Sequence, residues 1–298
     1  MRISIHSSDE SIGLADWLEA LMVVDGCLTV SRSTMRRHLR GSVSMDSGDL
    51  DVTIELLTQE VSRRRQVAGK TYPFSVESGN VRLALSGDSL CYVFLLCIST
   101  SAPLRCENRQ GEVELLLDMV VLDALCGYLS GGSRGVHFGW PTSGDRPPSF
   151  PAAIEWLANH LGLRLGKGEK RAARKDAGVD VVVWRPFRDQ REGFATILAQ
   201  CTSAIDWTEK GKDIVTDLWR GYIDFGKDPI TCLAIPFVIP RPFDKWDELR
   251  RTVHFVLDRL RICELLEDVD LTVYEQVEEW TCTELRSMGQ VADEENMG

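Results

Sequence analysis

Three apolar runs in the second half of the chain place the strongest limit on what it can fold into. They are VDVVVW at 179–184, ATILAQC at 195–201 and ITCLAI at 230–235. Apolar runs of this length without alternation are typical of strands that are buried on both faces of a sheet. A segment with helical spacing, 206–223, separates the second run from the third. The sequence therefore predicts an α/β (α+β) fold with a central mixed sheet flanked by helices.

Two longer helices are predicted upstream of these strands. One covers 111–132 and ends at its glycines, and the other covers 151–165, where Pro151 suits the first turn. The stretch between them, 135–150, is rich in glycine and proline and is predicted to be a loop. Two apolar stretches stay ambiguous. Residues 89–100 fit a buried helix or a strand, and residues 252–266 fit a strand or the start of a helix.

The first part of the chain follows a different pattern. Helices are predicted within 14–24, 31–39 and 49–69, and a hairpin with a Gly-Asn turn follows at 72–85. Three helices and a hairpin is the order of a winged helix, which binds DNA in many proteins. The same order of elements occurs in modules that bind a partner protein and in modules that only pack against the rest of their own chain. Residues 1–90 are therefore predicted to form a separate winged-helix-like module.

Charge is distributed unevenly along the chain. The formal net charge is −11, and residues 264–298 contain eleven acids and one base, which leaves about −1 for the rest. We predict a domain at 91–266 followed by an acidic, partly disordered extension at 267–298. An interaction peptide and a DNA-mimicking cover over basic residues are the alternatives for this extension.

One basic run leads into the first apolar strand. Residues 164–175 contain six bases and one acid. Arg171, Arg174 and Lys175 are the candidates for contacts to a nucleic-acid backbone, because clustered bases attract polyanions. The alternative is an ordinary solvated surface.

The cysteines and the hydropathy indicate a compartment. Nine cysteines are scattered with no CxxC pair, which is typical of reduced thiols in the cytoplasm. No apolar run is long enough for a membrane span, and the first residues lack the apolar core of a secretory signal. We therefore expect a cytoplasmic protein that makes no membrane contact.

Polar residues interrupt the apolar strands at two points. Asp180 opens the first run, and Gln200 lies near the end of the second. If the two strands are neighbours, both side chains lie at one edge of the sheet. Oxygen ligands of this kind suit Mg²⁺ or Mn²⁺, and the main-chain oxygen of Cys201 could add a third. In a metal-dependent phosphodiesterase, a nearby lysine would orient or deprotonate the water that attacks the phosphate.

The stretch DAGVD…AQC resembles the restriction-endonuclease-like PD-(D/E)xK nucleases, and in particular their Mrr-like branch. The resemblance covers roughly 112–266. It implies Asp180 and Gln200 as catalytic residues, with Asp180, Gln200 and the Cys201 main chain as metal ligands. Thr202 stands where the lysine of that pattern is expected, so Lys210 is the candidate lysine and Lys212 the second choice.

The resemblance also implies an acid on a helix before the strand of Asp180. Asp118 is the first candidate and Glu114, one turn earlier, is the alternate. The polar stripe of an amphipathic helix would explain both acids equally well. His137, His160 and His254 are isolated in the sequence, so a histidine metal site has little support.

Taken together, the resemblance implies a metal-dependent nuclease that hydrolyses DNA in bacterial restriction or anti-phage defence. It also implies a separate ATPase or sensor subunit as a partner, and it is compatible with a homo-oligomer. The alternative is a catalytically inactive nuclease-fold scaffold that binds DNA or a partner protein.

Overall fold

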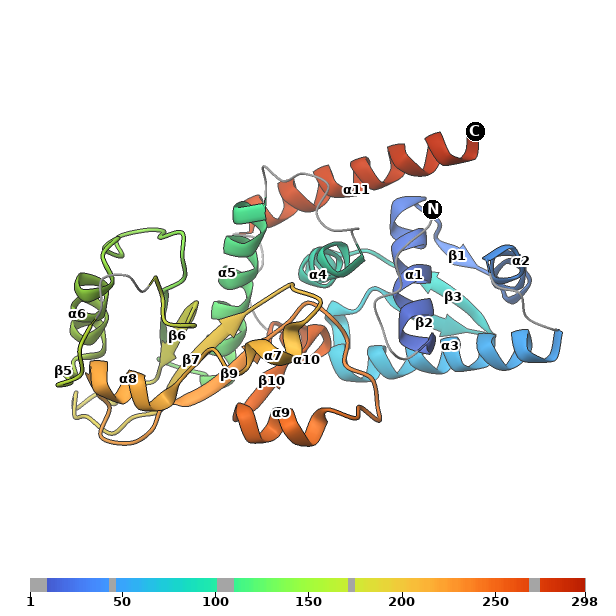
Figure 1. The fold of residues 1–298 in the computed structure, drawn as a ribbon. Helices are drawn as coiled ribbons and strands as arrows, with labels where there is room; N and C mark the ends of the chain where they lie inside the picture. Colours follow the sequence, from blue (N-terminus) through green and yellow to red (C-terminus); the bar gives the residue numbers. More distant parts are fainter. Residues whose placement is uncertain (1–9, 43–46, 101–109, 171–174, 268–273, 298) are drawn as a thin grey trace. The chain divides into compact units, whose positions relative to one another are not determined.

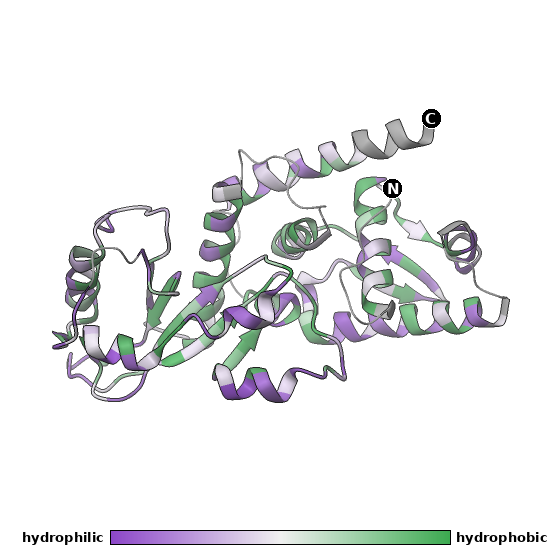
Figure 2. Ribbon diagram, viewed as in Figure 1, coloured by the Kyte–Doolittle hydropathy of each residue, from purple (hydrophilic) through white to green (hydrophobic). Residues whose placement is uncertain are grey.

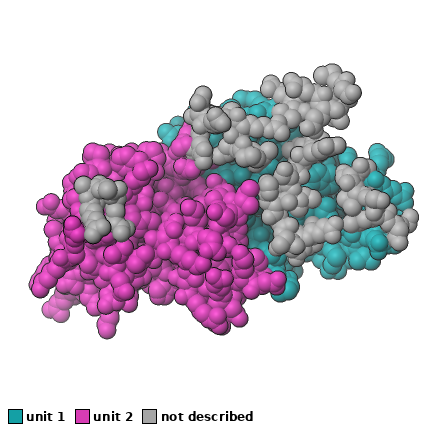
Figure 3. Space-filling view, in the orientation of Figure 1, with its two compact units in different colours: residues 1–107, 236–242, 259–298 teal, residues 108–235, 243–258 magenta. Residues whose placement is uncertain are grey.

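The chain divides into two compact units. The computed structural model describes residues 10–42, 47–100, 110–170, 175–267 and 274–297. Unit 1 comprises residues 1–107, 236–242 and 259–298, and unit 2 comprises residues 108–235 and 243–258 (Figure 3). Unit 1 therefore takes segments from all three of the domains that the sequence predicts at 1–90, 91–266 and 267–298.

The first part of unit 1 is helical with a small sheet. In chain order its elements are α1 (Glu10–Val24), β1 (Thr29–Val30), α2 (Arg32–Ser42), α3 (Ser47–Ala68), β2 (Phe74–Glu77) and β3 (Asn80–Leu83) (Figure 1). The three strands are antiparallel in the order β1-β3-β2. Ser78 and Gly79 join β2 to β3 with φ values of 50° and 76°. Two positive φ values in succession suit a tight hairpin, so the predicted hairpin is present with its turn at these residues.

Three further helices complete unit 1. They are α4 (Leu90–Thr100), α10 (Arg259–Leu265) and α11 (Glu275–Met297). The ambiguous stretch 89–100 is thus a buried helix. Helix α11 packs on α4, and Trp280 contacts Phe94 edge to face with ring centroids 5.3 Å apart. A helix therefore occupies a segment for which the sequence predicted partial disorder, because its apolar residues have a surface to pack on.

Unit 2 contains a five-stranded mixed sheet in the order β10-β9-β7-β6-β4. Its strands are β4 (Arg134–His137), β6 (Val181–Trp184), β7 (Thr196–Cys201), β9 (Ile230–Ala234) and β10 (Phe255–Leu257). Strands β4, β6 and β7 are antiparallel neighbours, whereas β9 runs parallel to both β7 and β10. Figure 2 shows that most of this sheet is hydrophobic. The predicted central mixed sheet is confirmed.

The remaining elements of unit 2 surround this sheet. They are α5 (Gln110–Leu129), α6 (Phe150–Leu161), β5 (Arg164–Leu165), α7 (Trp207–Lys210), α8 (Thr216–Tyr222), β8 (Ile223–Asp224) and α9 (Trp246–Thr252). Helix α5 packs on β4, β6 and β7. The prediction of a loop throughout 135–150 is wrong at its start, because β4 pairs with β6 there. Strand β4 is short and lies at the edge of the sheet, so it has no long apolar run to reveal it.

Among the residues that the structure describes, no helix is both long enough and apolar enough to cross a membrane.

Candidate functional site

Strand pairing in unit 2 brings three chain segments to one edge of the sheet. His137, the last residue of β4, pairs with Val181 at the start of β6, and Val181 also pairs with Ala199 near the end of β7. Because β6 is antiparallel to both neighbours, the ends of β4 and β7 meet the start of β6. The main chain of Asp180 is held on both sides. Its N–H donates to the Ala199 carbonyl at 2.8 Å, and its carbonyl accepts from the Gly139 N–H at 2.9 Å.

The approach to Asp180 is a tight turn. The N–H of Gly178 donates to the carboxylate of Asp176 at 2.9 Å, and Ala177 and Gly178 have φ values of 55° and 77°. A Cβ on Gly178 would lie 2.4 Å from the carbonyl oxygen of Asp213. Glycine is therefore required here for its backbone conformation and for the close approach of Asp213. This requirement explains the DAGVD stretch that the sequence offers as a motif.

Asp118, the helical acid that the resemblance implies, lies close to Asp180. Asp118 lies on α5 with 7% of its surface exposed. One carboxylate oxygen of each acid and the sulfur of Cys201 lie within 4.8 Å of one another. The N–H of Cys201 donates to Oδ2 of Asp180 at 2.8 Å, which fixes that carboxylate. The helical acid and the strand acid thus face one site.

His137 belongs to this site, although its isolation in the sequence argued against a histidine metal site. Its Nε2 lies 3.0 Å from Oδ2 of Asp118, and its Nδ1 lies 2.7 Å from Oγ of Ser143. The imidazole is only 7% exposed. Its approach to Asp118 depends on the pairing of β4 with β6. The sequence analysis missed His137 because it did not predict the edge strand β4. No other feature of the sequence indicates that His137 lies near Asp118.

Gly139 leaves room where these groups converge. A Cβ at this position would lie 2.8 Å from Nε2 of His137 and 3.2 Å from both Oδ2 of Asp118 and Oδ1 of Asp180. An imidazole nitrogen and two carboxylates therefore surround one space beside the main chain. A side chain at residue 139 would fill part of it.

Burial controls the electrostatics of the site. It raises the pKa of Asp180 well above the ordinary value of 3.8, and the neighbouring charge of Asp118 raises it further. Burial also raises the pKa of Asp118, against the hydrogen bond and charge of His137. The pKa of the Cys201 thiol is raised well above its ordinary value by burial and by both carboxylates. A cation would relieve the repulsion between these groups.

Gln200 has an unused acceptor. Its side-chain nitrogen donates to the carbonyl of Cys201 at 3.3 Å, whereas its Oε1 is buried and accepts no hydrogen bond from the described residues. A buried acceptor without a donor is costly unless a ligand satisfies it. The Cys201 carbonyl, the third predicted metal ligand, is thus already an acceptor for Gln200.

The two candidate lysines form ion pairs of their own. The amine of Lys210 lies 3.8 Å from a carboxylate oxygen of Asp213, and the Lys210 side chain is 40% exposed. Lys212 pairs with Glu209 at 2.7 Å and with Glu248 at 3.3 Å. Across the described part of the chain, no lysine or arginine forms an ion pair with Asp118 or Asp180. The catalytic assignment of Lys210 stays a prediction.

The other predicted residues lie around the site or outside the described structure. Glu114 is exposed on α5, and its charge contributes to the raised pKa of Asp180. Arg171 and Arg174 lie outside the described residues. Lys175 is exposed, and its carbonyl accepts a hydrogen bond from the buried Arg146 at 2.7 Å. Contacts of these bases to nucleic acid stay a prediction.

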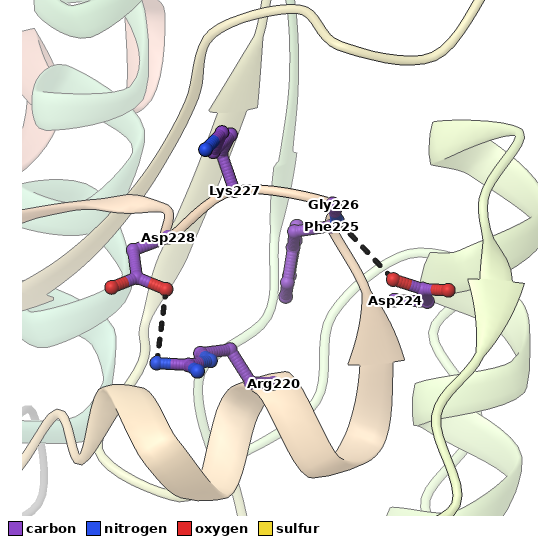
Figure 4. A pocket seen from close by; sticks show the side chains of 6 residues that line it. All are labelled: Arg220, Asp224, Phe225, Gly226, Lys227 and Asp228. Carbon is purple, nitrogen blue, oxygen red and sulfur yellow. Dashed lines mark hydrogen bonds and ion pairs between the residues drawn. The ribbon is translucent and has the colours of Figure 1, made fainter.

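A surface pocket of about 700 Å³ lies elsewhere in unit 2 (Figure 4). Its lining residues are Arg220, Asp224, Phe225, Gly226, Lys227 and Asp228. Arg220 pairs with Asp228 at 3.2 Å, and the Gly226 N–H donates to Asp224 at 3.3 Å. Arg220 and Asp228 thus satisfy each other, and none of the predicted site residues lines this pocket.

Comparisons with protein-family models, with curated proteins and with solved structures found no match for this chain.

Proposed function

We propose that unit 2 is a metal-dependent nuclease of the restriction-endonuclease-like type that hydrolyses phosphodiester bonds of DNA. The observation that carries the proposal is the convergence of Asp118, Asp180 and His137 on the space beside Gly139. Two neighbouring carboxylates with raised pKa values, one buried and one half-buried, need a cation to ionise together. The unused oxygen of Gln200 is a further group that a cation would satisfy.

The placement of these residues supports the hypothesis of a nuclease. The resemblance implies a mixed sheet, an acid at the start of one strand, a glutamine near the end of the next and an acid on a preceding helix. In unit 2, Asp180 directly precedes β6, Gln200 lies near the end of β7, and Asp118 lies on α5. Unit 1 offers the helix and hairpin order expected of a winged-helix-like DNA-binding module, and α2 carries several arginines.

Each side chain of the site would have a separate role in binding the ion. Asp118 and Asp180 would hold Mg²⁺ or Mn²⁺, with Gln200 as an additional oxygen ligand. The bound ion would lower the pKa of a water molecule and neutralise charge on the scissile phosphate. The N–H of Cys201 would keep Asp180 in one orientation.

DNA cleavage in the presence of a divalent ion tests this proposal. The purified chain is incubated with plasmid, linear duplex, single-stranded DNA and RNA in Mg²⁺ or Mn²⁺. We expect cleavage of DNA that falls more than about 100-fold in Asp180→Asn and Asp118→Asn, because each removes a metal ligand. Asp217→Asn is the matched control, since Asp217 is exposed on α8 and pairs only with Arg220 among the described residues. Cleavage that survives both substitutions would contradict the site.

The second candidate is a nuclease-fold scaffold that binds DNA or a partner protein without cleaving. Thr202 at the usual lysine position and the ion pair of Lys210 with Asp213 favour it. Lys210→Ala and Lys212→Ala separate the two candidates. A specific loss of cleavage in Lys210→Ala supports the nuclease with a displaced lysine. DNA binding without cleavage by the wild type, with or without an ATPase partner, supports the scaffold.

A further inference from the structure

His137 occupies the position of a metal ligand at the edge of the sheet. We infer that its Nε2 is a nitrogen ligand of the ion held by Asp118 and Asp180, and that this site takes a first-row transition ion such as Mn²⁺ in preference to Mg²⁺. The inference rests on the metal site of the proposed function and adds a ligand that the resemblance does not supply.

The distances fit ligation as well as hydrogen bonding. Neighbouring ligands on an octahedral ion with bonds of about 2.1 Å lie about 3.0 Å apart. His137 Nε2 and Asp118 Oδ2 are separated by 3.0 Å. Both atoms and Oδ1 of Asp180 lie within 3.2 Å of the position that a Cβ of Gly139 would take. Three potential ligand atoms therefore already face the space that a side chain at residue 139 would occupy.

Ser143 prepares the imidazole for ligation. Oγ of Ser143 lies 2.7 Å from Nδ1 of His137 and can act as donor or acceptor. When Ser143 accepts a hydrogen bond from Nδ1–H, the lone pair of Nε2 is free for an ion. Histidine ligands of metals usually hold such a partner on their second nitrogen, which fixes both the tautomer and the ring orientation.

The set of donors decides the preferred ion. Mg²⁺ favours oxygen ligands and keeps several waters, whereas imidazole nitrogen suits first-row transition ions better. The Cys201 sulfur lies within 4.8 Å of the two carboxylate oxygens and adds a soft atom beside the site. A site with one nitrogen and two carboxylates therefore discriminates against Mg²⁺.

The same contacts also resemble the hydrogen bonds of a serine–histidine–aspartate hydrolase. Such a hydrolase must stabilise a developing oxyanion with hydrogen-bond donors. Here the imidazole contacts the buried Asp118, and the half-buried carboxylate of Asp180 lies beside the same space, so both repel negative charge. The arrangement therefore favours a cation over an acyl intermediate.

Electron paramagnetic resonance of bound Mn²⁺ tests the inference on the full chain. The metal-free protein is titrated with Mn²⁺, and nitrogen modulation of the electron spin echo reports a coordinated imidazole. We expect this modulation in the wild type and its loss in His137→Gln, together with a fall of more than about tenfold in Mn²⁺ affinity. Mg²⁺ affinity, measured by competition, should fall by less than about threefold, because Mg²⁺ depends on oxygen ligands.

Two further variants sharpen the result. His160→Gln is the matched control, because His160 is exposed on α6 and bonds to the Trp156 carbonyl; it should behave as the wild type. Ser143→Ala keeps the imidazole but removes its partner, so it should keep the modulation and lower Mn²⁺ affinity. It provides a second measurement if His137→Gln does not fold, which circular dichroism will show.

The outcomes separate the inference from the proposed function. Bound Mn²⁺ without nitrogen modulation, with the same Mn²⁺ and Mg²⁺ affinities in His137→Gln, would overturn the histidine ligand and leave the nuclease intact. Absence of binding by either ion to the wild type at millimolar concentration would overturn the metal site and the metal-dependent nuclease together. Covalent labelling of Ser143 by a fluorophosphonate would also overturn it, in favour of a serine hydrolase.

Discussion

Arg259 donates a hydrogen bond from each terminal nitrogen to the two carboxylate oxygens of Asp16, both at 3.0 Å, across 243 positions of the chain. The guanidinium is fully buried, and its Nε also donates to the Pro236 carbonyl at 2.9 Å. The same network includes the buried Arg64 and Glu19, which pair at 2.9 Å. The charged residues thus join the start of unit 1 to its C-terminal part.

Loss of Arg259 should destabilise unit 1 strongly. Arg259→Leu leaves Asp16 and Glu19 buried with one cation fewer, which we expect to cost about 3–5 kcal/mol in the free energy of unfolding. Urea unfolding followed by tryptophan fluorescence measures it. Arg82→Gln is the matched control, since Arg82 pairs with Glu77 at an exposed site and should change stability by less than about 1 kcal/mol. Equal effects of the two substitutions would contradict the buried pairing.

Trp280 should anchor helix α11. Its side chain is 2% exposed and packs against Phe94 of α4. We expect Trp280→Ala to lower the free energy of unfolding by about 3–5 kcal/mol, the usual cost of emptying a large aromatic position. Thr283→Ala, one turn further on an exposed face, should cost less than about 1 kcal/mol. An unchanged unfolding midpoint in Trp280→Ala would contradict this packing and favour the partly disordered extension that the sequence alone predicts.

The sequence predicted the sheet of unit 2 because its buried strands carry continuous apolar runs. The sequence also predicted that Asp180 lies close to the end of β7. That prediction required the local apolar patterns and the assumption that the two strands are neighbours in the sheet. The approach of Asp118 followed from the family resemblance. The sheet and the edge at Asp180 therefore depend on local patterns that the residues themselves display, whereas the approach of Asp118 does not.

His137 and Arg259 show what the sequence alone does not determine. The approach of His137 to Asp118 depends on an edge strand of four residues, whose glycine and histidine give no apolar alternation. The pairing of Arg259 with Asp16 is non-local, so no periodicity predicts it. The grouping of 236–242 and 259–298 with the N-terminal residues has the same cause. Such contacts arise from tertiary packing rather than from local preference.

Gly139→Ala should block the metal site without removing a ligand. The new methyl group would lie 2.8 Å from His137 Nε2 and 3.2 Å from the two carboxylates, so the side chains must move apart. We expect a loss of more than about tenfold in Mn²⁺ affinity, measured by titration calorimetry. Gly131→Ala is the matched control because no atom lies within 4 Å of its Cβ position. Wild-type affinity in Gly139→Ala would show that the ion does not use this space.

The Asp180 carboxyl should make the metal-free protein less stable as pH rises above the ordinary pKa of an aspartate. Burial and the charge of Asp118 raise the folded-state pKa of Asp180 well above 3.8, so the folded protein holds a proton that the unfolded chain releases. This contribution is fully present below 3.8 and is lost as pH rises through the folded-state pKa. Each pKa unit of difference corresponds to about 1.4 kcal/mol.

Urea unfolding in chelator from pH 4 to pH 8 measures this dependence, and Asp180→Asn should flatten it because the amide does not titrate. Asp118, Asp176, Glu114 and the Cys201 thiol also face this carboxyl or lie near it, so part of the slope should survive the substitution. Saturating Mn²⁺ should reverse the trend in the wild type, since ion binding requires the deprotonated carboxylates and therefore strengthens with pH. A slope that is identical in the wild type and Asp180→Asn would contradict the raised pKa of Asp180 in the metal-free protein.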